Sequence, residues 1–185
     1  MSENRGIFSL EEFYDLQVSG ETTNIFEVFR YVNSLASDQG TDYGYFAGGH
    51  PGPTGPYSRI DRIDYSNDSA TAAVKGPLSL ARRAFTGTGN ASFGYFGGGD
   101  PGKVSTINRI DYSNDTATAS VKGPLNTGRD RLAATGNADF GYFGGGASPS
   151  DNSTVDRVDY SNDTATAVVK GPLTSGVTNI RVRSA

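Results

Sequence analysis

The chain repeats one block of about 48 residues three times, and this repetition constrains the fold more than any single residue does. The second and third copies begin FGYFGGG at Phe93 and Phe140, and the first begins YGYFAGG at Tyr43. Each copy then passes through a variable loop into a run such as INRIDYSNDTATASVKGPL, at 107–125 in the second copy. A recurring unit of this size is one supersecondary piece that buries its apolar face on its neighbours.

Each copy contains four short candidate strands. In the second copy we expect them around 83–87, at 93–96, at 105–112 and at 116–122. The first strand of the first copy is expected at 33–40. The 25 Gly residues, together with many Asn, Asp, Ser and Thr residues, supply the backbone conformations that tight turns need. The sequence therefore predicts an all-β fold of short strands joined by turns.

The ends and faces of the fourth strands can also be predicted. Pro124 cannot donate to a central ladder, so it marks the end of the fourth strand of the second copy. In the last copy, the alternation of side chains predicts that Ala165, Ala167 and Val169 share one face.

These residues resemble the kelch repeat. Residues 142–145 (YFGG) resemble its glycine doublet, 155–160 (VDRVDY) its third strand, and 123–125 (GPL) with Arg129 its closing segment. The resemblance covers residues 35–173 and implies four-stranded β-propeller blades. The family usually has Trp in the fourth strand, but this chain has no Trp. Small residues stand nearby instead: Ala117, Ala119 and Val121.

The expected layout is a short N-terminal anchoring segment at 1–32, three kelch-like repeats at about 33–78, 79–125 and 126–173, and a closing strand at 174–185. Closed propellers typically take about 4 to 8 blades. Three blades therefore predict either a propeller completed by a second copy of the chain or another closed shape. A β-trefoil, which also uses three repeats of four strands, is the alternative.

The N-terminal segment has no repeat relation to the rest and is rich in aromatic residues. It carries Phe8, Phe13, Tyr14, Phe26, Phe29 and Tyr31. A segment this short cannot bury so many aromatic rings by itself. Two interpretations stay open: it packs on the first blade, or it docks on another protein as an anchoring peptide does.

The sequence offers little for catalysis. It has no Cys, and His50 is the only His, so neither a Ser-His-Asp triad nor a zinc site with several N or S ligands is expected. The Ser-Asn-Asp turns lack the dense ligand spacing of a calcium loop, and we expect no metal and no cofactor. A net charge of −4 with dispersed Lys and Arg argues against nucleic acid, and no apolar stretch is long enough for membrane insertion.

The loops after the glycines vary while the strands nearly repeat. Loops on one rim of a rigid scaffold often bind ligands, although relaxed constraint at exposed tips explains the variation equally well. The candidate residues for a glycan or a host-surface receptor are His50, Tyr57, Asp100, Lys103 and Asp151.

Repeats of the YSNDTATA type also resemble those of structural proteins of tailed bacteriophages, especially marine ones. That resemblance implies a non-enzymatic virion component, such as a tail fibre, decoration or attachment protein, made in the host cytoplasm. It would form homo-oligomers and meet other virion proteins through its N-terminal segment. The alternative is a kelch-like binding module that recognises a glycan or host-surface protein through its rim loops.

Overall fold

The computed structural model describes residues 42–50 and 55–174. Their strands form three separate antiparallel sheets, one for each repeat, so the prediction of an all-β fold is confirmed. Within this part of the chain, no helix is long and apolar enough to cross a membrane.

The strands follow the repeats in order. The first sheet contains β1 (Tyr43–Ala47), β2 (Ile60–Asp64) and β3 (Ala73–Lys75). The second contains β4 (Thr86–Gly89), β5 (Phe93–Gly97), β6 (Ile107–Asp111) and β7 (Ser120–Lys122). The third contains β8 (Ala133–Gly136), β9 (Phe140–Gly144), β10 (Val155–Asp159) and β11 (Val168–Lys170).

Each sheet is a meander in which strands adjacent in sequence are hydrogen-bonded neighbours. The register is also repeated: Phe93 lies opposite Asp111 in the second sheet, and Phe140 lies opposite Asp159 in the third. Near-identical sequences therefore give near-identical pairing, as expected when turn chemistry and alternation set the register.

A single 3-10 turn follows the third strand of each repeat: η1 (Tyr65–Asn67), η2 (Tyr112–Asn114) and η3 (Tyr160–Asn162). The preceding aspartate caps the turn. In the second sheet, Asp111 Oδ1 accepts from the Ser113 amide at 2.9 Å and from the Ser113 hydroxyl at 2.6 Å. These bonds favour the ionised carboxylate, so they lower the pKa of Asp111. The turn places the next aspartate, Asp115, against the preceding sheet.

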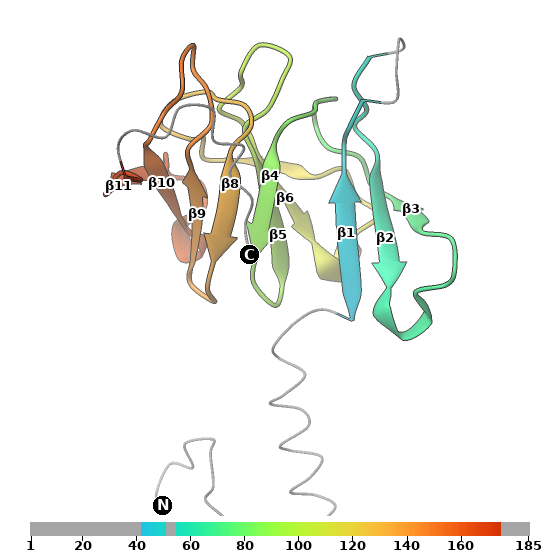
Figure 1. The fold of residues 1–185 in the computed structure, drawn as a ribbon. Coiled ribbons are helices and arrows are strands. Elements are labelled where there is room, and N and C mark those ends of the chain that lie inside the picture. Colours follow the sequence, from blue (N-terminus) through green and yellow to red (C-terminus); the bar gives the residue numbers. More distant parts are fainter. Residues whose placement is uncertain (1–41, 51–54, 175–185) are drawn as a thin grey trace, which may run out of the picture. The chain divides into compact units, whose positions relative to one another are not determined.

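The second sheet lies between the first and the third (Figure 1). Two apolar clusters fill the two boundaries. The cluster between the first and second sheets contains Ile60, Leu78, Phe96, Ile110 and Ala119. The cluster between the second and third sheets contains Tyr95, Ile107, Leu125, Leu132, Ala134, Phe143, Val158 and Ala167. The core is thus built from contacts between repeats, as in other repeat proteins.

Two details of the predicted strands were wrong. The fourth strand of the second repeat begins at Ser120 rather than at 116, because the Ala119 amide donates to the Pro77 carbonyl of the neighbouring sheet. The first strand begins at Thr86 rather than near 83. Of the three residues predicted to share one face, Ala167 is buried whereas Ala165 and Val169 are exposed, and β11 begins only at Val168.

Several predicted elements lie outside the described residues. They are the anchoring segment at 1–32, the first strand expected at 33–40, and all of the closing strand beyond Thr174.

Candidate functional site: the junction between neighbouring sheets

Asp115 joins the second sheet to the first. Its Oδ2 accepts from Tyr45 Oη at 3.0 Å and from Arg62 Nη1 at 2.9 Å, and its Oδ1 lies 3.1 Å from Lys75 Nζ. These donors come from β1, β2 and β3, one from each strand. A single nearly buried carboxylate therefore holds every described strand of the preceding sheet.

Asp163 repeats this arrangement between the third and second sheets. It accepts from Tyr95 Oη at 3.0 Å and from Arg109 Nη1 at 2.7 Å, and it lies 3.2 Å from Lys122 Nζ. We call each set of one aspartate and three donors a carboxylate junction. Charge-assisted bonds of this kind are about twice as strong as neutral ones.

A pair of stacked tyrosines lies beside each junction. Tyr45 stacks on Tyr112 with ring centroids 5.0 Å apart, and Tyr95 stacks on Tyr160 at 4.6 Å. The tyrosine that donates to the aspartate is therefore also held by a ring from the sheet that carries that aspartate.

Backbone hydrogen bonds add a second connection at each boundary. The Gly76 amide donates to the Asp115 carbonyl at 2.8 Å, and the Gly123 amide donates to the Asp163 carbonyl at 2.8 Å. The Ala167 amide likewise donates to the Pro124 carbonyl at 2.9 Å.

Glycine is required where the backbones meet. A Cβ on Gly76 would lie 1.9 Å from the Ala117 carbonyl oxygen, and one on Gly123 would lie 1.8 Å from the Ala165 carbonyl oxygen. A side chain at either position would force the two sheets apart.

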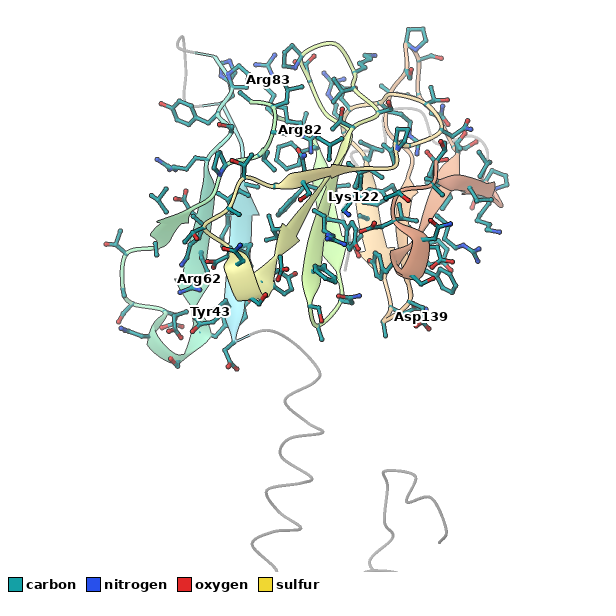
Figure 2. All side chains as sticks on the ribbon, turned by 180° about the vertical axis from the view of Figure 1, so that it is seen from behind. Tyr43, Arg62, Arg82, Arg83, Lys122 and Asp139 are labelled. Atoms are coloured by element: carbon teal, nitrogen blue, oxygen red, sulfur yellow. The ribbon has the colours of Figure 1, made fainter. Side chains whose placement is uncertain are left out.

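The arginines of the junctions are held by aromatic rings. Arg62 lies over the Tyr43 ring at 3.9 Å from its centroid, and the two side chains lie together in Figure 2. Arg109 lies over Phe93 at 4.1 Å. Such cation–π contacts fix the guanidinium in place for its carboxylate.

The electrostatics of the junctions keep the tyrosines protonated. Burial and the hydrogen bond to Asp115 raise the pKa of Tyr45 to about 12. The same causes, with Asp163 as the partner, raise the pKa of Tyr95. Both phenols therefore donate at neutral pH, and the geometry is suited to holding sheets together.

Two buried arginines donate hydrogen bonds to backbone carbonyls of the second and third sheets and of an adjoining loop. Arg129 Nη2 donates to the Phe143 carbonyl at 3.1 Å and to Asp156 Oδ2 at 3.0 Å, with both charged side chains fully buried. Arg82 donates instead to the carbonyls of Phe96 and Thr106, and burial lowers its pKa to about 10.

The predicted rim residues lie in three loops. His50 is exposed and Tyr57 is partly exposed, and the Tyr57 amide closes their loop on the Gly49 carbonyl. Asp100 accepts from Arg83, which lies at the opposite end of the sheets from Tyr43 in Figure 2.

The other two rim residues lie near each other. Lys103 Nζ donates to the Pro149 carbonyl at 3.3 Å, so the loops of the second and third repeats meet, and exposed Asp151 lies in the latter. Ligand binding by these residues stays a prediction. The six aromatic residues predicted to dock, Phe8, Phe13, Tyr14, Phe26, Phe29 and Tyr31, lie outside the described residues.

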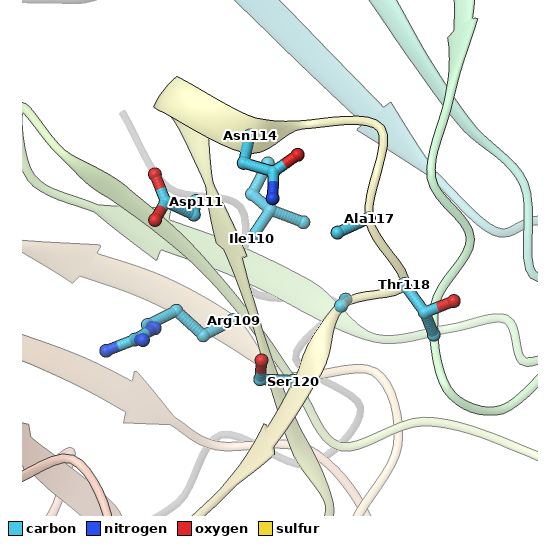
Figure 3. Close-up of a pocket in the computed structure, with 8 residues that line it drawn as sticks. Arg109, Ile110, Asp111, Asn114, Ala117, Thr118 and Ser120 are labelled. Carbon is cyan, nitrogen blue, oxygen red and sulfur yellow. The ribbon is translucent and has the colours of Figure 1, made fainter.

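Two surface hollows lie next to the 3-10 turns η2 and η3. The first, of about 150 Å³, lies against β6, η2 and β7 and is lined by residues such as Arg109, Asn114 and Thr118 (Figure 3). The second, of about 420 Å³, lies between the second and third sheets and includes Phe93 and Asp139. In the part of the chain that the structure describes, no group of three or more His, Cys, Asp or Glu side chains could hold a metal ion.

The sequence reasoning treated the Ser-Asn-Asp aspartates as turn residues and missed the carboxylate junctions. The available signal was the recurrence of one Tyr, one Arg and one Lys with each aspartate in every copy. A charged residue that never varies among repeats indicates a contact between repeats, because turn geometry alone does not require three matched donors.

Comparison of the chain with models of known protein families found no match. Comparison with curated proteins found no match either.

Proposed function

We propose that this chain is a non-enzymatic structural subunit of a phage virion, in which kelch-like blades form a rigid body. One observation carries the proposal: Asp115 and Asp163, which each accept from three side chains of the preceding sheet, join one sheet to the next. A buried carboxylate that accepts from three donors of one neighbouring sheet has its oxygens occupied by structural contacts and is suited to linking the sheets.

The architecture supports blades over a β-trefoil. Each described sheet is a separate meander, and in the described part no strand forms a ladder with a strand of another sheet. The recurring Tyr, Arg, Lys and Asp set relates each sheet to the next in the same way, as rotation about a propeller axis would. The phage assignment rests on the resemblance of the YSNDTATA repeats and on the aromatic segment at 1–32.

Peptide mass spectrometry of purified particles tests this proposal. We expect the chain in washed virions at a fixed stoichiometry, and its loss from them when residues 1–32 are deleted. The variant that lacks residues 1–32 must keep the wild-type melting temperature, so that its loss from virions reflects failed attachment and not misfolding. A chain that stays in the soluble lysate and never enters particles contradicts the proposal.

The second candidate function is a binding module that uses its rim loops. The hydrogen bond from Lys103 to Pro149 favours it, because the bond gathers two variable loops into one surface. Replacing 100–106 and 147–154 by Gly-Ser turns should abolish retention on a glycan or host-cell surface. Unchanged retention excludes this function.

A further inference from the structure

The two outer faces of the described sheets carry unmatched halves of the junction. Each sheet offers donors to the sheet that follows it and an aspartate to the sheet that precedes it. The first sheet therefore retains an aspartate without a preceding sheet, and the third retains donors without a following one. We call these the leading face and the trailing face, with their residues defined below.

The leading face belongs to the first repeat. It comprises the counterparts of residues that contact the preceding sheet at both internal boundaries: Phe46, Tyr65, Asp68, Ala70 and Ala72. Phe46 is 63% exposed, whereas its equivalents Phe96 and Phe143 are 9% and 0% exposed. Tyr65 is 59% exposed, although its equivalents Tyr112 and Tyr160 stack on tyrosines of the preceding sheet. Asp68 is exposed, whereas Asp115 and Asp163 are buried.

The trailing face belongs to the third repeat. It comprises Tyr142, Gly144, Arg157, Lys170, Gly171 and Pro172. Arg157 is already positioned, because it lies over the Phe140 ring at 4.2 Å from the centroid, as Arg62 and Arg109 lie over their rings. Its Nε is buried and has no hydrogen-bond partner within the described ranges 42–50 and 55–174.

In the described part of the chain, the space beside the two glycines of the trailing face is not occupied by a following sheet, although the space beside their equivalents at the internal boundaries is. Among the described residues, a Cβ on Gly171 would meet nothing within 4 Å, although one on Gly123 would collide with Ala165. A Cβ on Gly97 would lie 2.7 Å from the Phe143 ring of the next sheet, whereas one on Gly144 would meet only Val155 and Leu173 of its own repeat.

We infer that the leading face of one copy of this chain docks on the trailing face of a second copy, forming a third carboxylate junction between subunits. Asp68 of one copy accepts from Tyr142, Arg157 and Lys170 of the other. Tyr65 stacks on Tyr142, and Phe46 lies over Gly144. This inference deepens the structural role proposed above and rests on it.

The occupant is a second copy because this chain's own repeat offers the matching groups on its two outer faces. The sequence YSND occurs at 65–68, 112–115 and 160–163, and the latter two already fill the internal junctions. Residues 175–185 contain neither Asp nor Tyr, and residues 1–41 contain no YSND. Since the two faces are different, the contact is head to tail, and such contacts close into rings or extend into filaments.

Two single substitutions test the two faces in the full-length chain. Gly171→Ala places a methyl group in open space in the single chain but against the Ala70 carbonyl of a docked copy, so it should abolish association without lowering the melting temperature. Asp68→Ala removes an exposed carboxylate and should weaken self-association about 30-fold or more. Asp139→Ala, which removes an exposed carboxylate at the β8–β9 turn, is the matched control and should associate normally.

Mixing gives the sharper result. Asp68→Ala has an impaired leading face and Gly171→Ala an impaired trailing face, so each variant alone should sediment as a monomer at the lowest concentrations at which the wild type associates. An equimolar mixture retains one complete junction and should form a one-to-one dimer in analytical ultracentrifugation. A wild-type chain that stays monomeric over the whole accessible concentration range overturns the inference. Association that survives both substitutions also overturns it, and would place the contact in residues 1–41 or elsewhere.

Failure here is distinguishable from failure of the proposed function. A monomeric chain found in virions rejects the subunit junction alone, whereas a head-to-tail oligomer missing from virions rejects the phage role alone.

Discussion

The second and third repeats each bury an arginine, but, among the described residues, only in the third does the arginine lie beside a carboxylate. Comparing the two repeats therefore indicates how much the carboxylate contributes to stability. In the third repeat Arg129 is paired with Asp156, and both are fully buried. In the second repeat the position equivalent to Asp156 is Asn108, and Arg82 has no carboxylate partner among the described residues. Arg82 Nε and Asn108 Oδ1 are both buried, and neither has a hydrogen-bond partner in the part of the chain that the structure describes.

We predict that Asn108→Asp stabilises the protein. The new carboxylate would form an ion pair with Arg82 equivalent to the pair between Asp156 and Arg129. This pair would offset the cost of burying an uncompensated guanidinium. The expected gain in the free energy of unfolding is about 1 kcal/mol. Urea denaturation at neutral pH measures it, with the exposed Asn114→Asp as control. An unchanged or lower midpoint for Asn108→Asp contradicts this account of the buried arginine.

The junction tyrosines predict how stability depends on alkaline pH. The pKa of Tyr45 is raised to about 12 by burial and by Asp115, and burial raises the pKa of Tyr112 to about 12. An unfolded tyrosine ionises near pH 10, so between about pH 10 and 12 the unfolded state binds fewer protons than the folded one. The contribution of these two tyrosines to the free energy of unfolding should therefore be complete below pH 10 and should decrease as the pH rises towards 12.

Thermal unfolding followed across this range checks the tyrosine prediction. Tyr45→Phe should flatten the alkaline decline, because one of the shifted groups is gone. Tyr57→Phe, at an exposed ring outside the junctions, is the matched control. Equal slopes for wild type and Tyr45→Phe would show that the junction phenol does not contribute.

At the scale of the elements, the turn after each fourth strand decides how closely two sheets approach. Gly76, Gly123 and Gly171 stand at equivalent positions, but only the first two are covered by the carbonyl of a following sheet. The small side chains of Ala117 and Ala165, whose carbonyls cover these glycines, agree with this close backbone contact. The glycine is thus needed for the contact between sheets.

Gly123→Ala should destabilise the protein by about 3 kcal/mol, because its Cβ would overlap the Ala165 carbonyl and push the third sheet away. Gly171→Ala should be neutral or slightly stabilising at concentrations where the chain is monomeric, since its Cβ is unopposed. Chemical denaturation of both variants measures the contrast. Similar losses at the two positions would mean that backbone conformation, rather than contact between sheets, requires the glycine.

At the scale of the whole molecule, stability depends on coupling between neighbouring sheets more than on any one sheet. In a repeat protein each unit contacts only its neighbours, so the junctions between sheets should determine how cooperatively the repeats unfold. The second sheet takes part in both junctions, and the outer two take part in one each.

Asp163→Ala should therefore uncouple the third sheet first. It leaves Tyr95, Arg109 and Lys122 without their shared acceptor and should cost about 2–4 kcal/mol. Amide hydrogen exchange should accelerate in β8–β11 while β1–β3 stay protected. Asp115→Ala should reverse this pattern by exposing the first sheet. Uniform acceleration over all three sheets after either substitution would show that the described part unfolds as one unit.

The sequence by itself determined the all-β class, the number of repeats and the positions of most strands, because turn residues and repeated aromatic runs act locally. It placed Phe93 and Phe140 at strand starts, yet misplaced the strand at 116–119, where Ala119 hydrogen-bonds to another sheet. Only the tertiary structure decided what the Ser-Asn-Asp aspartates do. Asp115 and Tyr45 are separated by 70 positions, and such a pairing depends on how whole sheets stack, which no local pattern encodes.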